Sequence, residues 1–263
     1  MACYLIDLDG TIYCGPRPLP YAAEFIRRLN RAGRPYRFLT NAPERSPRLV
    51  ERELRRMGIP AEKGSVLSAG TLSVEYLAGQ PKKDGPLRVC LLGNRYIRRL
   101  AALKGLVLTD QDPDWLLVSF GEEITIGEIR QACRLIRRGV PFLATNPDDL
   151  IPSADGLMPH TGAILRAITQ ATGAEPLMIG KPSNSLGKSF LRLFGCAAQE
   201  IRVIGDRLDT DMAFARNCGF QAWLMLTGST GRQEALEAKG QFDRSFSTME
   251  ELALPAFFPE EAL

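Results

Sequence analysis

The chain has 263 residues, of which 45% are hydrophobic and 24% are charged, and its formal net charge is +3. No run approaches the roughly 20 apolar residues that a membrane helix needs, so we expect a globular protein without a membrane partner. The arginine pairs are dispersed over predicted helix surfaces instead of forming one basic block, which argues against nucleic acid as a partner.

The cysteine and histidine content limits which catalytic and metal sites the chain can form. The six cysteines are scattered without a C-x-x-C pair, and the first predicted strand begins at Cys3, which leaves no room for a signal peptide. We therefore expect reduced thiols and a cytoplasmic protein. His160 is the only histidine, so a catalytic triad or a multi-histidine metal site would have to be built around it. Carboxylates must supply most of any acid–base or metal chemistry.

Short apolar runs alternate with longer amphipathic stretches, which predicts an α/β fold built on a doubly wound, mostly parallel sheet. The clearest helices are Tyr21–Ala32 and Ile126–Arg138, in which apolar residues recur at helical spacing. The predicted strands, in chain order, are Cys3–Leu8, Tyr36–Leu39, Val66–Leu67, Leu87–Leu92, Leu116–Phe120, Phe142–Ala144, Leu177–Ile179, Ile201–Ile204 and Ala222–Leu226.

The length favours two domains. The best candidate for a linker is the stretch 79–86, because its consecutive proline and glycine residues disfavour both helix and strand. A second boundary is expected near Glu175 and Pro176.

The first strand runs directly into Asp7-Leu8-Asp9-Gly10-Thr11. Ligands usually bind where the strands of a parallel sheet end, and two neighbouring carboxylates there need a cation or hydrogen-bond donors to offset their repulsion. Mg²⁺, which prefers a few carboxylates together with phosphate oxygens, meets this need. A plain Asp-Gly turn that only ends the strand is the structural alternative.

Three further predicted strands end in polar residues. They lead into Thr40-Asn41, into Gly180-Lys181-Pro182 and into Gly205–Asp211, which holds three carboxylates. Taken singly, the first two are consistent with an ordinary turn and a solvated lysine, but helix capping accounts for only one or two of the three carboxylates. Together they could hold a dianionic phosphate against a carboxylate nucleophile.

These four motifs, in this order, resemble those of the haloacid dehalogenase superfamily, and within it the NagD-like branch. The stretches that carry the second resemblance are Ala144–Asp148, Gly180–Ser183 and Gly205–Asp211. In that branch a cap domain is inserted between the second and third motifs. The resemblance therefore implies a catalytic core of residues 1–79 and 177–263 with an inserted α/β cap, residues 80–176, in agreement with the Pro/Gly linker.

The resemblance also implies catalytic roles. Asp7 would attack phosphorus, and Asp9 would protonate the leaving oxygen and then deprotonate the attacking water. Thr40 and Lys181 would bind the transferring phosphoryl group.

Other roles follow from the same resemblance. The residues expected to bind substrate are Gly10, Thr40, Asn41 and Lys181. His160 is added as a residue of the cap that would face the substrate, with an ordinary packed or surface histidine as the alternative. Mg²⁺ would be held by the Asp7 carboxylate, the Asp9 backbone carbonyl and Asp206, with Asp209 or Asp211 orienting these ligands.

Three stretches depart from the pattern of the branch and point to a different substrate preference. Ala42–Pro47 replaces the usual asparagine and small polar residues, and Gly121–Thr125 would make an acidic lip. His160 stands where small residues are more usual.

The function expected is Mg²⁺-dependent hydrolysis of a small phosphate monoester: a nucleoside monophosphate, a sugar or polyol phosphate, phosphoglycolate or pyridoxal phosphate. Phosphoryl transfer to an alcohol and phosphometabolite binding without hydrolysis remain as alternatives. A nucleotide-binding dehydrogenase is set aside because no G-x-G-x-x-G follows a predicted strand. The resemblance also leaves open a homodimer formed through the cap.

Overall fold

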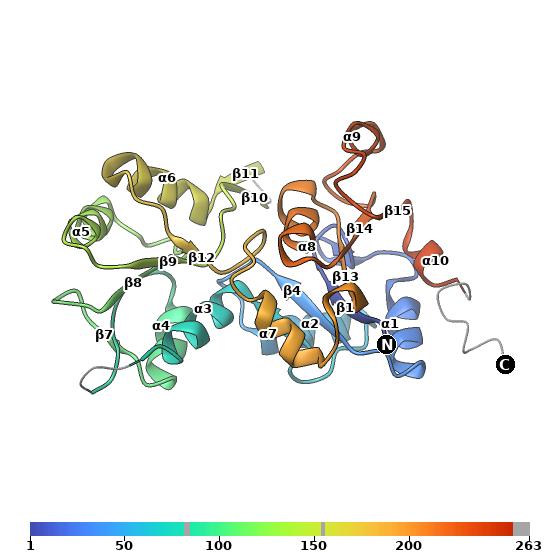
Figure 1. Cartoon of the computed structure of the whole chain (residues 1–263), viewed down its shortest axis with the longest axis horizontal. Helices are drawn as coiled ribbons and strands as arrows, with labels where there is room; N and C mark the ends of the chain where they lie inside the picture. The colour runs from blue at the N-terminus through green and yellow to red at the C-terminus, as the bar shows by residue number, and fades with distance from the viewer. Residues whose placement is uncertain (82–84, 154–155, 255–263) are drawn as a thin grey trace. The chain divides into compact units, whose positions relative to one another are not determined.

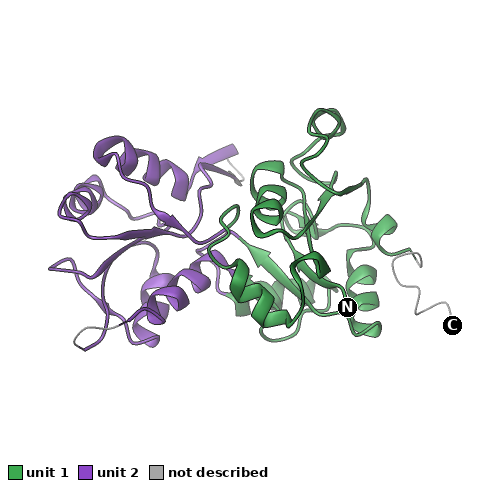
Figure 2. Cartoon of the chain, viewed as in Figure 1, with its two compact units in different colours: residues 1–40, 47–67, 181–263 green, residues 41–46, 68–180 purple. Residues whose placement is uncertain are grey.

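The computed structural model describes residues 1–81, 85–153 and 156–254, which form two compact units (Figures 1 and 2). The first unit comprises Met1–Thr40, Pro47–Leu67 and Lys181–Leu263, and the second comprises Asn41–Ser46 and Ser68–Gly180. Each unit contains a parallel sheet with helices, which confirms the predicted α/β class.

The sheet of the first unit has six strands in the order β15-β14-β13-β1-β4-β5, and the neighbouring strands from β15 to β4 are parallel. Their bounds are β1 Cys3–Ile6, β4 Tyr36–Thr40, β5 Val66–Ser68, β13 Ile201–Gly205, β14 Gln221–Met225 and β15 Arg244–Phe246. β1 lies between β13 and β4, with Ile6 paired to both Ile204 and Phe38. The carboxyl ends of these three strands therefore lie at one edge of the sheet.

Helices cover both faces of this sheet. On one face the helices α1 (Ala22–Arg31), α2 (Pro47–Arg56) and α10 (Met249–Leu252) pack against a core that includes Tyr4 and Ile6. Since side chains alternate along a strand, Leu5 faces the other side. There α8 (Ala213–Cys218) contacts β14, and the ring of Phe214 meets Phe190 of α7 (Gly187–Phe194) edge-on. The remaining elements are the hairpin β2 Tyr13–Cys14 with β3 Arg17–Pro18, the short helix α9 Arg232–Glu237, the 3₁₀ turn Ala198–Glu200 and the π-helical turn Leu208–Met212.

The sheet of the second unit has five parallel strands in the order β12-β9-β8-β6-β7. Their bounds are β6 Arg88–Leu92, β7 Val107–Leu108, β8 Trp115–Val118, β9 Phe142–Ala144 and β12 Leu177–Met178. The helices are α3 Ala69–Ala78, α4 Arg95–Leu103, α5 Ile126–Arg137 and α6 Thr161–Thr172, and β10 Leu150–Ser153 pairs with β11 Gly156–Pro159. α5 and α6 supply Leu135 and Ile168 to a core that they share with Leu92 and Val118.

Every predicted strand overlaps an observed one, whereas β2, β3, β7, β10, β11 and β15 were not predicted. The missed strands are only two to four residues long, too short to show an alternating pattern. α3 belongs to the second unit, where Thr71 Oγ1 lies 2.9 Å from the Tyr96 hydroxyl and Lys104 donates to Glu75 at 2.8 Å. The longer segment of the second unit thus begins at Ser68, before the stretch 79–86 expected as a linker, of which residues 82–84 lie outside the described part.

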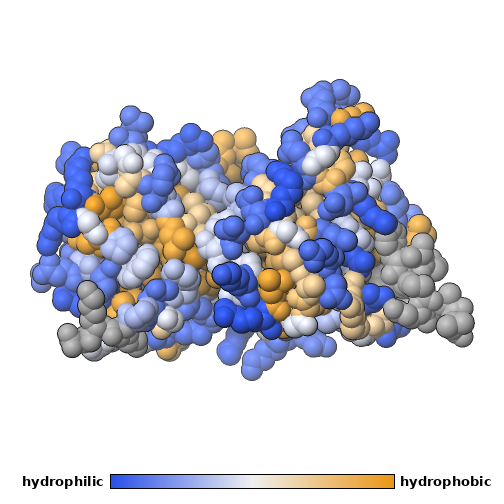
Figure 3. Space-filling view, in the orientation of Figure 1, coloured by the Kyte–Doolittle hydropathy of each residue, from blue (hydrophilic) through white to orange (hydrophobic). Residues whose placement is uncertain are grey.

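All six cysteines are free thiols. Among the described residues, no helix combines the length and apolar character that crossing a membrane requires. Figure 3 shows hydrophilic side chains spread over both units on the face drawn.

Candidate active site

Lys181 is the centre of a buried charge cluster in the first unit. It follows β12 in the chain and is only 4% exposed. Its ammonium group donates to Asp7 Oδ1 and to Asp211 Oδ1, both at 2.5 Å, and to the backbone carbonyl of Leu39 at 3.2 Å. Asp7 directly follows β1, and Leu39 lies near the end of β4. The structure therefore brings the lysine to the edge of the sheet at which the motif strands end.

Asp206 is buried immediately after β13. One carboxylate oxygen, Oδ2, accepts the backbone N–H of Ser229 at 2.5 Å. The other, Oδ1, is buried and has no hydrogen-bond partner among the described residues. A Cβ on Gly10 or on Gly228 would overlap the Asp206 carboxylate, so the backbone can approach this side chain only because both residues are glycine.

The loop after β14 completes this part of the site. Thr227 Oγ1 donates to the Gly10 carbonyl at 2.7 Å, and Ser229 supplies the amide that binds Asp206. This loop was not predicted from the sequence. The available signal was the polar stretch Thr227–Thr230 directly after a predicted strand, which is the same feature that marked the other four motifs.

Asp211 and Asp209 have different surroundings, although both lie on the π-helical turn Leu208–Met212. Asp211 is 1% exposed; besides contacting Lys181, it accepts the Arg207 backbone N–H at 3.2 Å. A Cβ on Gly205 would overlap the Asp211 side chain. Asp209 is exposed, and the Arg207 guanidinium holds it through bonds of 3.0 and 2.8 Å. The structure thus groups Asp211, and not Asp209, with Asp7 and Lys181.

Burial and charge perturb the pKa values of this cluster. Burial, reinforced by the neighbouring carboxylates, raises the pKa of Asp7 well above its usual value, although Lys181 opposes the shift. Burial and the charge of Asp211 raise the pKa of Asp206 to about 6, against the lowering effect of the hydrogen bonds from Ser229. Burial alone would lower the pKa of Lys181, but the carboxylates of Asp211 and Asp7 outweigh it and raise that pKa. The site is therefore short of positive charge.

The cluster fits a divalent cation. Asp7, Asp206 and Asp211 each offer a carboxylate oxygen, and these oxygens all lie within 4.8 Å of one another. Lys181 brings one positive charge against three carboxylates, and Asp206 Oδ1 is buried without a partner in the described part of the chain. Hard oxygen ligands with excess negative charge are the donor set that Mg²⁺ prefers.

The other predicted site residues fall in two places. In the first unit, Asp9 is exposed just beyond Asp7, and Thr40 is the last residue of β4, 8% exposed and next to Leu39. Asn41 and His160 belong to the second unit. There His160 is 2% exposed and stacks on Phe120, with ring centroids 4.4 Å apart. This enclosure favours a role inside the unit over a direct contact with substrate.

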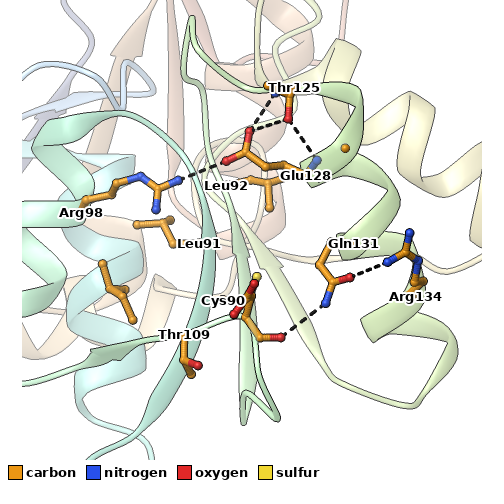
Figure 4. Close-up of a pocket in the computed structure, with 12 residues that line it drawn as sticks. Cys90, Leu91, Leu92, Arg98, Thr109, Thr125, Glu128, Gln131 and Arg134 are labelled. Carbon is orange, nitrogen blue, oxygen red and sulfur yellow. Dashed lines mark hydrogen bonds and ion pairs between the residues drawn. The ribbon is translucent and has the colours of Figure 1, made fainter.

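The second unit also carries an open groove of about 600 Å³ beside β6 and α5 (Figure 4). Its polar side chains bind protein groups of the same unit: Gln131 donates to the Asp110 backbone carbonyl at 3.4 Å, Arg134 donates to Gln131, and Glu128 caps α5 together with Thr125. Among the described residues, no buried polar atom that lacks a partner lines this groove. We therefore assign no ligand to it.

Comparison with known proteins places these features in a family. The sequence profile of haloacid dehalogenase-like hydrolases matches residues 4–106, and a second profile of HAD-type hydrolases matches residues 178–252. The chain is 35% identical to the 5'-nucleotidase YutF of Bacillus subtilis over 88% of this chain and 89% of the relative. It is 33% identical to an acid sugar phosphatase of Staphylococcus aureus, with 86% of each chain covered.

Solved structures agree with the sequence relatives. A 4-nitrophenylphosphatase from Thermotoga maritima superposes with a TM-score of 0.88 at 31% identity, covering 96% of each chain. A glycerol phosphate phosphatase from Mycobacterium tuberculosis, solved in complex with magnesium, superposes with a TM-score of 0.84 at 28% identity, covering 95% of this chain and 76% of the other. The profiles, the relatives and the shared fold show that this chain belongs to the haloacid dehalogenase-like hydrolases as a NagD-like member.

Proposed function

We propose that this chain is a phosphoric monoester hydrolase that cleaves a small phosphate ester with Mg²⁺ through an aspartyl-phosphate on Asp7. The observation that carries the proposal is the contact of one buried lysine with both Asp7 and Asp211, in a cluster with the partly unpaired carboxylate of Asp206. A dianionic phosphoryl group would supply negative charge that Lys181 can bind, and Asp7, which directly follows β1, would be the nucleophile.

In the first step, an Asp7 oxygen forms a bond to phosphorus while the bond to the ester oxygen breaks. Asp9, which is exposed beside the nucleophile, gives its proton to the departing alcohol. In the second step, Asp9 takes a proton from water, the water oxygen bonds to phosphorus, and the bond to Asp7 breaks to release phosphate. Lys181 holds the phosphoryl oxygens through both steps, with Thr40 assisting from the end of β4.

The carboxylates of Asp7 and Asp206, with the Asp9 carbonyl, would hold Mg²⁺, and Asp211 would orient this group through Lys181. When bound, Mg²⁺ offsets the negative charge that builds up between the phosphate and the carboxylate nucleophile. The role of Asp209 in orienting the metal ligands rests on the family resemblance alone, since its partner in the structure is Arg207.

We also propose that the second unit is the cap that selects the substrate. The named relatives include enzymes for nucleotides, acid sugar phosphates and glycerol phosphate, so substrate classes differ among proteins of this fold. Nucleoside monophosphates and sugar or polyol phosphates are therefore the classes proposed for this chain. The homodimer through this unit and the cytoplasmic location stay predictions.

Phosphate release from a panel of phosphometabolites and p-nitrophenyl phosphate, with Mg²⁺ or with EDTA, tests the proposal. We expect release with Mg²⁺ and none with EDTA. A glycerol phosphate product in the presence of added glycerol would instead favour the phosphotransferase alternative. Tight binding of a phosphometabolite without any turnover would favour the binding-protein alternative.

Gly228→Ala is expected to raise the Mg²⁺ concentration needed for half-maximal activity by about tenfold or more, because the new Cβ would displace the Asp206 carboxylate. Gly231→Ala is the matched control, since a Cβ at Gly231 has no atom within 4 Å. Titration of activity with Mg²⁺ measures both variants. Equal Mg²⁺ requirements in the two would contradict the assignment of Asp206 as a ligand.

A further inference from the structure

The segment Asn41–Ser46 is held by buried polar groups of the second unit. At one end of the segment, Asn41 Nδ2 donates to Asp148 Oδ2 at 3.0 Å. Further along it, Glu44 Oε2 lies 3.5 Å from His160 Nε2, at ion-pair distance, and neither atom has a hydrogen-bond partner in the described part of the chain. Asn146 contacts both Asp148 and His160, so Asn41 and Glu44 are connected through side chains of the second unit.

The hydrogen bonds of Asn146 fix the tautomer of His160. Its amide Nδ2 donates to Asp148 Oδ2 at 2.8 Å, and its Oδ1 accepts the Thr145 hydroxyl at 2.8 Å. Because an ionised carboxylate only accepts hydrogen bonds, this arrangement sets the orientation of the amide. The second Nδ2 hydrogen then points to His160 Nδ1, 3.2 Å away. Nδ1 is thus an acceptor, and Nε2 carries the proton that faces Glu44.

The loop after β9, which contains Thr145 and Asn146, also contacts the segment that leads into Lys181. The Gly180 N–H donates to the Thr145 carbonyl at 2.8 Å. A Cβ on Gly180 would lie 2.5 Å from that carbonyl oxygen and 2.6 Å from Asn41 Oδ1. Asn41 and Gly180 therefore meet at the end of β9. Each is one residue from a phosphoryl-binding residue of the proposed mechanism: Thr40 precedes Asn41, and Lys181 follows Gly180.

We propose that His160 is a positioning residue, which fixes Asn41–Ser46 through Glu44 and through the Asn146–Asp148 pair and thereby sets the placement of Thr40. The inference rests on the proposed function, because it assigns Thr40 to the phosphoryl group. All the side chains in this network belong to the second unit, and Asn146 and His160 are almost fully buried. The network thus links the unit proposed as the cap to the backbone of a catalytic motif.

His160→Phe tests the proposal, since it retains a ring that can stack on Phe120 but removes both nitrogens. Phe120→Leu is the matched control, because it removes the stacked ring and leaves the nitrogens in place. We expect His160→Phe to lower kcat for p-nitrophenyl phosphate by about tenfold or more, with less change in KM, and Phe120→Leu to change kcat by less than about threefold.

Two smaller substitutions test separately the contact of His160 Nδ1 with Asn146 and the contact of Nε2 with Glu44. His160→Asn keeps an acceptor near the Nδ1 position, so its kcat is expected to be higher than that of His160→Phe. Glu44→Gln keeps an acceptor for Nε2–H, whereas Glu44→Ala does not. Glu44→Ala should lower kcat more than Glu44→Gln does. A merely structural histidine would lower the melting temperature of all variants in parallel, without this ranking of kcat.

Hydrogen exchange of the backbone provides a readout that does not need activity. In His160→Phe we expect faster exchange in peptides covering residues 41–46, with peptides of β1 and β13 unchanged. Wild-type kcat or wild-type exchange in His160→Phe would overturn the proposal, as would an equal loss of kcat in Phe120→Leu. If the wild-type protein released no phosphate, the proposed function would fail, and the exchange of residues 41–46 would still decide whether His160 holds the segment.

Discussion

Replacing Asp7 by asparagine is expected to lower phosphate release by at least about 10⁴-fold, because an amide oxygen cannot replace the carboxylate as nucleophile. Thermal unfolding should show that the variant is still folded, since asparagine retains the size of the side chain and an oxygen that can accept from Lys181. The loss should appear in kcat with every substrate of the panel, because the nucleophile is common to all of them.

Asp112→Asn is the matched control for this experiment. Asp112 is an exposed carboxylate of the second unit whose partner is Arg138, and asparagine tolerates its positive φ of 43°. Phosphate release at the wild-type rate is expected. An Asp7→Asn protein with more than a few per cent of the wild-type rate would mean that another group attacks phosphorus.

Replacing Lys181 by methionine is expected to destabilise the protein by about 3 kcal/mol or more at pH 8 and to abolish activity. The substitution removes an ammonium group that contacts both Asp7 and Asp211, and it leaves these two carboxylates without that positive charge. Lys188→Met, at an exposed position of α7, is the matched control and should change stability little.

The pH dependence of this variant follows from the raised pKa of Asp7. A buried carboxyl whose pKa is above its unfolded value binds a proton more tightly in the folded state, so folding is favoured as pH falls through the raised pKa. Without Lys181 this pKa should rise further. The stability deficit of Lys181→Met should therefore be smaller at pH 5 than at pH 8, as measured by urea unfolding. A deficit that grows as pH falls would contradict this account of the cluster.

The sequence predicted those parts of the fold and site that depend on local patterns. β1 and β13 are apolar runs that end in charged residues, so their type and their place in a parallel sheet could be inferred before the structure was known. Asp7 and Asp206 then follow, because β1 and β13 bring their carboxyl ends to one edge. Lys181 does not follow in this way, because β12, the strand before it, pairs with β9 in the sheet of the second unit.

Contacts between distant segments could not be predicted in this way. Thr227–Thr230 resembles ordinary loop chemistry, and its contact with Asp206 depends on how β14 pairs with β13. The enclosure of His160 likewise depends on Phe120 and Glu44, which lie far from it in the chain. Asp209 and Asp211 are two residues apart on one turn, and their contacts distinguish them: Asp211 is buried against Lys181, whereas the Arg207 guanidinium holds the exposed Asp209.

The central claim is that the phosphoryl group passes through Asp7, and trapping that intermediate tests it most directly. The protein, with Mg²⁺ and a substrate found by the panel, would be quenched in acid within the first turnover and mapped by mass spectrometry. We expect a phosphoryl group on the peptide that contains Asp7, lost in Asp7→Asn and absent when substrate is omitted. Release of phosphate in the first turnover with no phosphoryl group on that peptide would contradict the account and point to direct attack by water.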